Sequence, residues 1–294
     1  MALSFDHRPP ETESIGLIHA LLDRGVTLFD TADVYTPDER APGHNERLIG
    51  KALRSWSGQR DSVVVATKGG YTRRNGQLIP NGRPDHLTQA CERSLRTLGV
   101  DAIALYQLHT PDPAVPFAES IGALRELRDQ GKIRWIGLSN VDLTRIETAR
   151  AIVPIQSVQN ELSLLRRDSA SIGPVARLEF RGVWWLRRLR LLLREPFHSG
   201  VLAHCERLGM GFLAYSPLGG AHSHRLVGHP VLERIAGDHG CSVYAVAIAW
   251  LLGQGSTVIP IPSARSTAHA MDTLDAVYLT LTERDVAEIE GVAL

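Results

Sequence analysis

The sequence predicts an α/β fold, a (β/α)8 barrel of the TIM-barrel type, and two features carry that prediction. Short apolar segments of strand length alternate with amphipathic helical segments, a pattern typical of a parallel sheet covered on both faces. Seven such strands follow one another in order, which favours a closed barrel over an open doubly wound sheet. The length of 294 residues is ordinary for one barrel domain, so we expect residues 1–294 to form a single domain.

The expected helices are recognised by apolar residues on one face and by their end signals. Ile15, Ile18 and Leu22 share one face of a helix over 11–24, which ends at Gly25. We expect Asp85 to cap the next helix but one, whose inner face carries Leu87, Cys91, Leu95 and Leu98. Further helices are expected over 46–53, 117–130 and 242–252, with a short one after Asp142.

Four of the expected strands deliver polar side chains at or just past their ends. Barrel enzymes keep their chemistry at the carboxyl ends of their strands, so these positions are candidates for a site. The four strand ends are Val26–Asp30 followed by Tyr35, 62–67 followed by Lys68, 102–108 followed by His109, and 133–138 followed by Ser139 and Asn140. The remaining strands are expected over 154–159, 211–215 and 257–261.

Composition excludes several classes of partner. With 32 basic and 32 acidic residues, nothing indicates nucleic acid or an anionic membrane surface. No apolar run reaches the roughly 18 residues of a membrane helix, and the N-terminus lacks the features of a signal peptide. The three cysteines lack the spacing of metal ligands, so we expect no metal and a role in core packing in a reducing cytoplasm. The expected partner is a small molecule, and the oligomeric state is open.

Two phrases at the strand ends, Phe29-Asp-Thr-Ala-Asp-Val-Tyr35 and Gly137-Leu-Ser-Asn140, are specific to one family. On these residues the chain resembles the aldo-keto reductases, over nearly its whole length. The resemblance implies a catalytic tetrad of Asp30, Tyr35, Lys68 and His109.

Carbonyl reduction by a nicotinamide needs an acid that protonates the developing alkoxide. Tyrosine is a weak acid at neutral pH, with a pKa of about 10, and a neighbouring ammonium makes its proton easier to give. We therefore expect Tyr35 to be the general acid, Lys68 to lower its pKa and Asp30 to orient Lys68. His109 would contact the carbonyl oxygen and share its charge.

The resemblance also implies the residues that bind the cofactor. Ser139, Asn140 and Gln159 would hold the nicotinamide carboxamide, and the nicotinamide ring would stack on Tyr215. Ser216 and Leu218 lie in the loop that runs along the diphosphate. Arg265, in a segment similar to the IPIPGxR motif, would pair with a 2′-phosphate, since a guanidinium fork suits phosphate. That choice favours NADP(H) over NAD(H), with Thr273 near the adenosine end.

The chain departs from the family pattern in three places. Aldo-keto reductases begin with a hairpin and a first barrel strand, and this sequence starts about where the following loop should be, so we expect the first strand to be missing or truncated. Residues 172–200 look like an insertion of roughly two dozen residues in a βα loop. Three interpretations of that insertion stay open: a lid over the substrate, a helix that binds a partner, or sequence without selected structure. Ser263 replaces the usual glycine of the adenosine motif, and Asp272-Thr273 stands where Glu-Asn is common.

The resemblance implies an oxidoreductase that reduces an aldehyde or ketone to an alcohol with NADPH. Two alternatives stay open: a regulatory or scaffold protein of the same fold that binds NADP(H), and an inactive truncated product. The physiological substrate is not specified by the sequence, because selectivity depends on variable loops.

Overall fold

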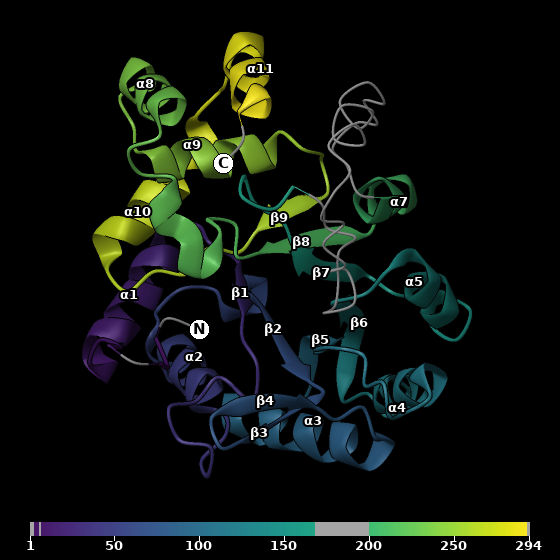
Figure 1. Cartoon of the computed structure of the whole chain (residues 1–294). Coiled ribbons are helices and arrows are strands. Elements are labelled where there is room, and N and C mark those ends of the chain that lie inside the picture. Colours follow the sequence, from purple (N-terminus) through teal and green to yellow (C-terminus); the bar gives the residue numbers. More distant parts are fainter. Residues whose placement is uncertain (1–2, 6, 168–199, 293–294) are drawn as a thin grey trace.

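The structure is a computed structural model that describes residues 3–5, 7–167 and 200–292. Its centre is a curled sheet of seven parallel strands with helices along its outer face (Figure 1). The strands, in their order across the sheet, are β1 (Leu28–Asp30), β2 (Val64–Gly69), β5 (Ile103–Leu108), β6 (Ile133–Ser139), β7 (Ser157–Glu161), β8 (Gly211–Tyr215) and β9 (Val258–Pro260). The predicted α/β barrel class is confirmed by this architecture.

The helices follow the strands in the alternating order expected from the sequence. They are α1 (Glu11–Asp23), α2 (His44–Ser55), α3 (Pro84–Leu98), α4 (Phe117–Asp129), α5 (Leu143–Arg150), α7 (Gly200–Leu208), α8 (Pro230–His239), α9 (Val243–Leu252), α10 (Thr267–Asp275) and α11 (Glu283–Gly291). Short 3₁₀ turns lie at η1 (Arg60–Ser62), η3 (Gly220–Arg225) and η4 (Ala276–Tyr278). The expected insertion lies outside the described residues except for Gly200, with which α7 begins.

The sheet has two unpaired edges in the part of the chain that the structure describes. β1 pairs only with β2, and β9 pairs only with β8, so these seven strands do not close on themselves. A closed ring would need a further pairing between β1 and β9, which is the position of the first strand in the expected eight-stranded barrel. The curvature of a barrel is therefore present, whereas closure is not formed by the described residues.

Strand register brings the polar strand ends to one level of the sheet. Asp30 of β1 lies opposite Ala66 of β2, and Lys68 of β2 lies opposite Gln107 of β5. Further along, Ser139 of β6 lies opposite Gln159 of β7. Because all seven strands run parallel, their carboxyl ends meet at one rim, where polar side chains from distant parts of the sequence come together.

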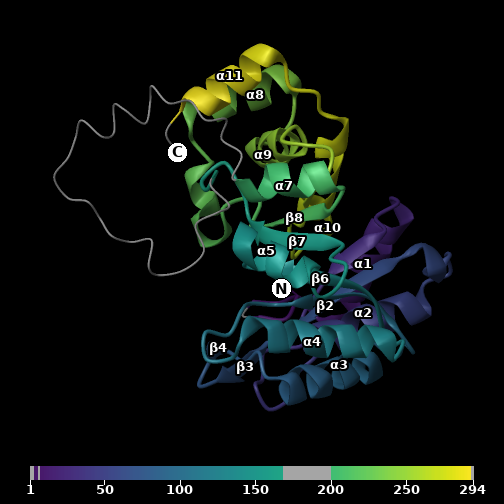
Figure 2. The ribbon, with the colours of Figure 1, turned by 90° about the vertical axis from the view of Figure 1, so that its right-hand side faces the viewer.

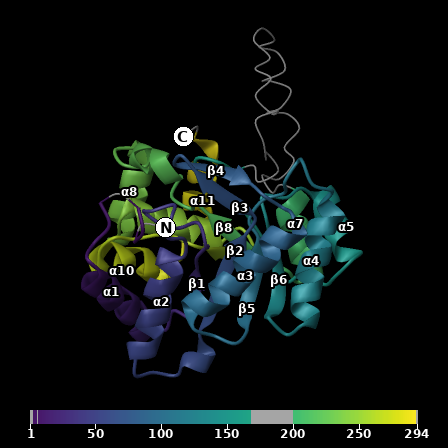
Figure 3. The ribbon, with the colours of Figure 1, turned by 90° about the horizontal axis from the view of Figure 1, so that it is seen from below.

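Two apolar clusters hold the helices against the sheet. The larger one joins the strands β5 to β8 to the helices α3, α4, α7 and α9, and includes the fully buried Phe212. The smaller one lies between α1 and α2, which Figures 1 and 3 show side by side, with Ile18 and Leu48 at its centre. The half-buried Phe29 of β1 packs against this smaller cluster.

An antiparallel hairpin that the sequence interpretation missed follows β2. It consists of β3 (Tyr71–Arg74) and β4 (Gln77–Pro80), and Figure 2 shows it outside the seven-stranded sheet. Gly70, with φ of 119°, provides the sharp exit from β2 that a residue with a Cβ atom rarely adopts. Asn75 and Gly76, both at positive φ, form the turn between the two strands.

Some helix and strand ends differ from their expected positions. Asp85 is not the N-cap of α3: Arg83 occupies that position without a side-chain hydrogen bond, and Pro84 begins the helix because its missing N–H needs no partner there. The helix after Asp142 is confirmed, and the Asp142 side chain accepts a hydrogen bond from the Arg145 amide. β7 was expected to begin at Pro154, but it begins three residues later, at Ser157, where pairing with β6 starts.

Cys91 and Cys205 are buried and Cys241 is half-buried, and all three are free thiols. Among the described residues no single helix is long and apolar enough to cross a membrane. In the part of the chain that the structure describes, one pair of helices, α8 and α9, passes that test of length and composition when taken together, and the chain bends by 88° between them.

Candidate active site

A buried ion pair joins the first two predicted site residues. The Lys68 ammonium donates hydrogen bonds to the Asp30 carboxylate and, at 2.8 Å, to the Thr31 carbonyl oxygen. Lys68 is fully buried, and the Asp30 side chain is only 10% exposed. A charge removed from water is tolerated when it is paired and hydrogen-bonded, as this one is.

The two remaining predicted residues lie beside this pair. The Lys68 nitrogen is 5.2 Å from the centroid of the Tyr35 ring, and the Tyr35 and His109 rings are 5.8 Å apart in an edge-to-face arrangement. Tyr35 is 7% exposed and His109 8%. The structure therefore brings all four residues of the expected tetrad together, from β1, β2, the residue after β5 and the loop that follows β1.

The environment sets the protonation state of each group. Burial raises the pKa of the Tyr35 hydroxyl. The charge of Lys68 lowers that pKa, as expected, but burial has the larger effect, so the pKa lies above its ordinary value. Burial alone would lower the pKa of Lys68, but the adjacent Asp30 and Tyr35 raise it above its ordinary value. Burial and the nearby Lys68 charge hold the pKa of His109 well below its usual range. At neutral pH this places a protonated tyrosine and a neutral imidazole beside an ammonium ion.

Two glutamines hold the Asp30 carboxylate on the side away from Lys68. The Gln159 amide nitrogen donates to Asp30 Oδ1 at 2.8 Å, and the Gln107 amide nitrogen donates to the same atom at 3.1 Å. Gln107 also accepts a hydrogen bond from Gln159 at 3.2 Å. Gln159 was expected to bind a carboxamide, and in this structure its amide contacts the tetrad. Gln107 was not predicted, although it points to the same side of β5 as His109, two residues later.

Gly137 provides the space that Gln107 occupies. A Cβ atom at this position would lie 2.8 Å from Gln107 Cγ and 2.5 Å from Ser157 Oγ, closer than real Cβ contacts allow. A glycine in a strand interior commonly marks such a close approach. The glycine of the GLSN phrase therefore has a packing reason in this structure.

A second polar group surrounds Asn140, at the end of β6. The Tyr215 hydroxyl donates to Asn140 Oδ1 at 2.8 Å, and Asn140 Nδ2 donates to the His109 carbonyl at 3.0 Å and to Ser139 Oγ at 3.1 Å. Asn140 has φ of 59°, a left-handed conformation that asparagine tolerates better than most residues. These contacts place the expected carboxamide-binding residues against the tetrad.

The remaining predicted cofactor residues are arranged less compactly. Ser216 and Leu218 directly follow Tyr215, and Ser216 has φ of 50°. Arg265 is exposed and lies just before α10. The Thr273 hydroxyl, inside α10, donates to the carbonyl groups of the preceding turn. In the described part of the chain, no hydrogen bond or ion pair joins Arg265 or Thr273 to the tetrad.

Two aromatic residues that were not predicted complete the surroundings of the tetrad. The Tyr71 ring, from β3, lies 4.7 Å from the His109 ring, and the Phe5 ring lies 6.2 Å from the Tyr35 ring. Phe5 and Tyr71 also pack against the small apolar cluster formed by Ala32, Val34 and Tyr35. The Asn75-Gly76 dipeptide, a hairpin signal, was the sequence feature that could have located Tyr71.

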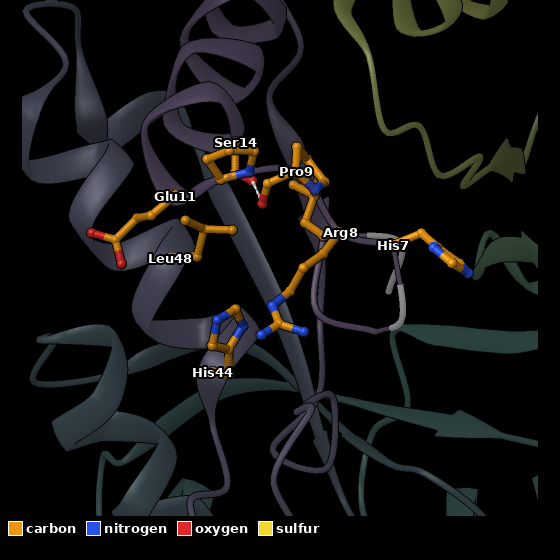
Figure 4. Close-up of a pocket in the computed structure, with 9 residues that line it drawn as sticks. His7, Arg8, Pro9, Glu11, Ser14, His44 and Leu48 are labelled. Carbon is orange, nitrogen blue, oxygen red and sulfur yellow. Dashed lines mark hydrogen bonds between the residues drawn. The ribbon is translucent and has the colours of Figure 1, made fainter.

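Two cavities lie away from the tetrad, and no predicted site residue lines either of them. One, of about 550 Å³, lies between the first residues of the chain, α1 and α2, with the Arg8 side chain extending toward His44 (Figure 4). Burial lowers the pKa of His44, as does the neighbouring Arg8 charge. The other, of about 580 Å³, is lined by basic residues of α2 and α3 above the buried carboxyl groups of Asp33 and Glu46.

The sequence matches one family model over most of its length. The model of the aldo/keto reductase family matches residues 2–183 and 188–293. The probable aldo-keto reductase 1 of Glycine max is 31% identical over 307 residues, which cover 95% of this chain and 79% of that protein.

Solved structures of similar fold include two aldo-keto reductases. One is a thermostable enzyme crystallised with the inhibitor epalrestat. It is 29% identical to this chain with a TM-score of 0.74, and the match covers 95% of this chain and 87% of that one. The other, from Klebsiella pneumoniae in complex with NADPH, has 25% identity and a TM-score of 0.72, with 95% of this chain and 84% of that chain covered.

Proposed function

This chain belongs to the aldo-keto reductase family, and we propose that it reduces an aldehyde or ketone to an alcohol by hydride transfer from NADPH. The family assignment makes it an oxidoreductase acting on a small carbonyl compound. The observation that supports the specific reaction is the position of the buried Lys68–Asp30 pair, whose ammonium lies 5.2 Å from the Tyr35 ring centroid.

In this proposal Tyr35 supplies the proton. Bound NADPH would provide the hydride, which goes to the carbonyl carbon while the carbonyl oxygen takes the Tyr35 proton. Lys68 stabilises the resulting phenolate, and its own position is fixed by Asp30 and the Thr31 carbonyl. Because the ammonium is already in place and buried, little reorganisation accompanies the proton transfer.

His109 is suited to hold the carbonyl oxygen. Its low pKa keeps the imidazole neutral, so that one ring nitrogen carries a hydrogen to donate. Its Nδ1 atom is buried, and within the described residues it has no hydrogen-bond partner. A buried polar atom without a partner is costly, and a bound ligand would relieve that cost.

The residues around Asn140 fit the nicotinamide amide. Ser139, Asn140 and Gln159 would supply donors and acceptors to it, and Tyr215, held by Asn140, would present its ring for stacking. Ser216 and Leu218 would follow the diphosphate, and Arg265 with Thr273 would lie at the adenosine end. NADP(H) is the proposed cofactor rather than NAD(H), and the relative from Klebsiella pneumoniae was crystallised with NADPH. The free state of all three cysteines also supports a reducing compartment such as the cytoplasm.

The test of the reaction is Tyr35→Phe, compared with the unaltered protein. We expect turnover of an aldehyde panel to fall by roughly 10²–10⁴-fold, the contribution typical of a positioned general acid. NADPH binding, followed by quenching of tryptophan fluorescence, should change little. Equal turnover in the variant would refute the role of Tyr35, and binding without turnover in the unaltered protein would favour the scaffold alternative.

The test of cofactor choice is Arg265→Ala. We expect the KM for NADPH to rise by roughly 10- to 100-fold, as for loss of a charge-assisted contact, while the KM for NADH changes less than about threefold. Steady-state kinetics with both cofactors measure this. An equal rise for the two would show that Arg265 does not contact a 2′-phosphate.

A further inference from the structure

The β3–β4 hairpin has two unlike faces. Along β3, Tyr71 and Arg73 are half-buried, whereas Thr72 and Arg74 are exposed. Successive side chains of a strand point to opposite sides, so Tyr71 and Arg73 form one face and Thr72 and Arg74 the other. The pairing of Arg73 with Leu78 and of Arg74 with Gln77 holds this alternation in register.

The inner face of the hairpin, defined as Tyr71 and Arg73, borders the tetrad. Tyr71 is 4.7 Å from His109, ring centroid to ring centroid. The Arg73 guanidinium carbon lies 5.2 Å from the centroid of Phe5, whose ring is in turn 6.2 Å from Tyr35. From the tetrad outward, the site therefore passes from His109 and Tyr35 to a pair of aromatic rings and then to a cation.

The Arg73 guanidinium is held in place with donors to spare. Its Nη1 donates to the carbonyl oxygen of Thr36, the residue after Tyr35, and its carbon lies over the Phe5 ring. Among the described residues, no hydrogen bond uses its Nε or Nη2, and no carboxylate pairs with it. A guanidinium fork fixed on one side and free on the other suits the planar geometry of a carboxylate.

The charged groups described near Arg73 leave its guanidinium available to a ligand. Lys68 is neutralised by Asp30. Two acids lie on the loop after Tyr35, and both accept hydrogen bonds from backbone groups: Asp38 from the Arg40 amide, and Glu39 from the Gly76 amide at the hairpin turn. Neither forms an ion pair with Arg73 in the described structure.

We propose that the inner face of the hairpin recognises an anionic group of the substrate, so that the preferred substrates are aldehydes or ketones that carry a carboxylate beyond an apolar body. The carbonyl group would lie at Tyr35 and His109, the apolar body against Tyr71 and Phe5, and the carboxylate at Arg73. This inference rests on the proposed carbonyl reduction and specifies the substrate class of that same site.

A purely structural role for Arg73 predicts something different. If the side chain only supported Phe5 and the Thr36 carbonyl, its loss would lower the turnover of charged and uncharged aldehydes alike. The ratio of kcat/KM between two aldehydes that differ only in a carboxylate separates these roles, because any general loss of active protein cancels in the ratio.

The experiment compares 4-carboxybenzaldehyde with benzaldehyde, using NADPH and three variants of the full chain. For Arg73→Met we expect the preference for the carboxylated aldehyde to fall by about tenfold, as for loss of a hydrogen-bonded charge pair. Arg73→Lys, which keeps the charge but loses the fork, should retain part of the preference. Arg74→Met is the matched control: it removes the same charge from the outer face, and its preference should stay within about twofold of the unaltered protein.

Several results would overturn the proposal. It fails if the preference is unchanged in Arg73→Met, if both aldehydes lose turnover equally, or if Arg74→Met lowers the preference as much. Absence of turnover with either aldehyde in the unaltered protein would instead count against the proposed reduction. The hairpin would then be tested by calorimetric titration with 4-(hydroxymethyl)benzoate and with benzyl alcohol: tighter binding of the anion that is lost in Arg73→Met supports the proposal, and equal binding refutes it.

Discussion

The middle of the sheet and its β1 edge are built in different ways. In β5 and β7 nearly every side chain is buried, and both strands have a hydrogen-bonded neighbour on each side. All three residues of β1 are half-buried, and β1 has one neighbour. Asp30 nevertheless belongs to this edge strand, so its position depends strongly on side-chain hydrogen bonds from Lys68, Gln107 and Gln159. A site residue on a half-buried edge strand can thus be held in position by hydrogen bonds from side chains on the neighbouring and central strands.

The largest stability difference is expected between two phenylalanines, one in each region. Phe212 of β8 is fully buried in the larger apolar cluster. Phe212→Ala should lower the free energy of unfolding by about 3–5 kcal/mol, through lost burial and a cavity that the surroundings fill only in part. Urea unfolding followed by tryptophan fluorescence measures this change.

Phe29→Ala provides the matched control at the edge. Phe29 is half-buried against the smaller cluster, so its loss should cost only about 1–2 kcal/mol. Equal losses for the two variants would show that the β1 edge is as tightly packed as the middle, and the contrast between the regions would then be wrong.

An effect that is smaller at each pH step, but spread over a range of pH, is expected from the acids buried near β1. Burial, together with the nearby Glu46, raises the pKa of Asp33 to about 8, although Arg93 acts in the opposite direction. Between about pH 4 and 8 the folded protein therefore keeps a proton on Asp33 that the unfolded chain has released. This group makes the folded state less stable as the pH rises, on the order of 1.4 kcal/mol for each pH unit within that range.

Asp33→Asn tests this by keeping the shape of the side chain without its titration. The free energy of unfolding, measured by urea at pH 5, 6, 7 and 8, should fall less steeply with pH in the variant than in the unaltered protein. Other titrating groups contribute to both proteins and cancel in the difference. Parallel curves would mean that Asp33 is ionised in the folded state.

Much of the fold could be predicted because its signals are local. Apolar strands and amphipathic helices alternate in the sequence, and β8 was placed at its observed bounds of Gly211–Tyr215. The hairpin was missed because two four-residue strands carry little apolar pattern, and its exposed residues Leu78 and Ile79 do not alternate with polar ones. The N-cap of α3 was wrongly placed at Asp85, because aspartate is favoured both as an N-cap and in the first turn of a helix.

The candidate site likewise contains residues that could be predicted from the sequence and residues that could not. Asp30 and Tyr35 lie within one family phrase, and all four tetrad residues lie at or just past predicted strand ends, which the parallel register brings together. Gln107, Tyr71 and Phe5 belong to no such phrase, and their proximity depends on three-dimensional packing between segments far apart in the sequence. Phe5, for example, meets Tyr35 and Arg73 only because the first residues of the chain lie against the loop after β1.

The two-faced hairpin also has a consequence for how this protein can evolve. Its inner face consists of two side chains that border the tetrad, whereas the tetrad itself is carried by the sheet and the segments that directly follow its strands. Under the proposed function, changes at Tyr71 or Arg73 would alter which carbonyl compounds are accepted and would leave the tetrad residues as they are. A duplicated gene could therefore reach a new substrate through one or two substitutions in the hairpin, without passing through an inactive intermediate.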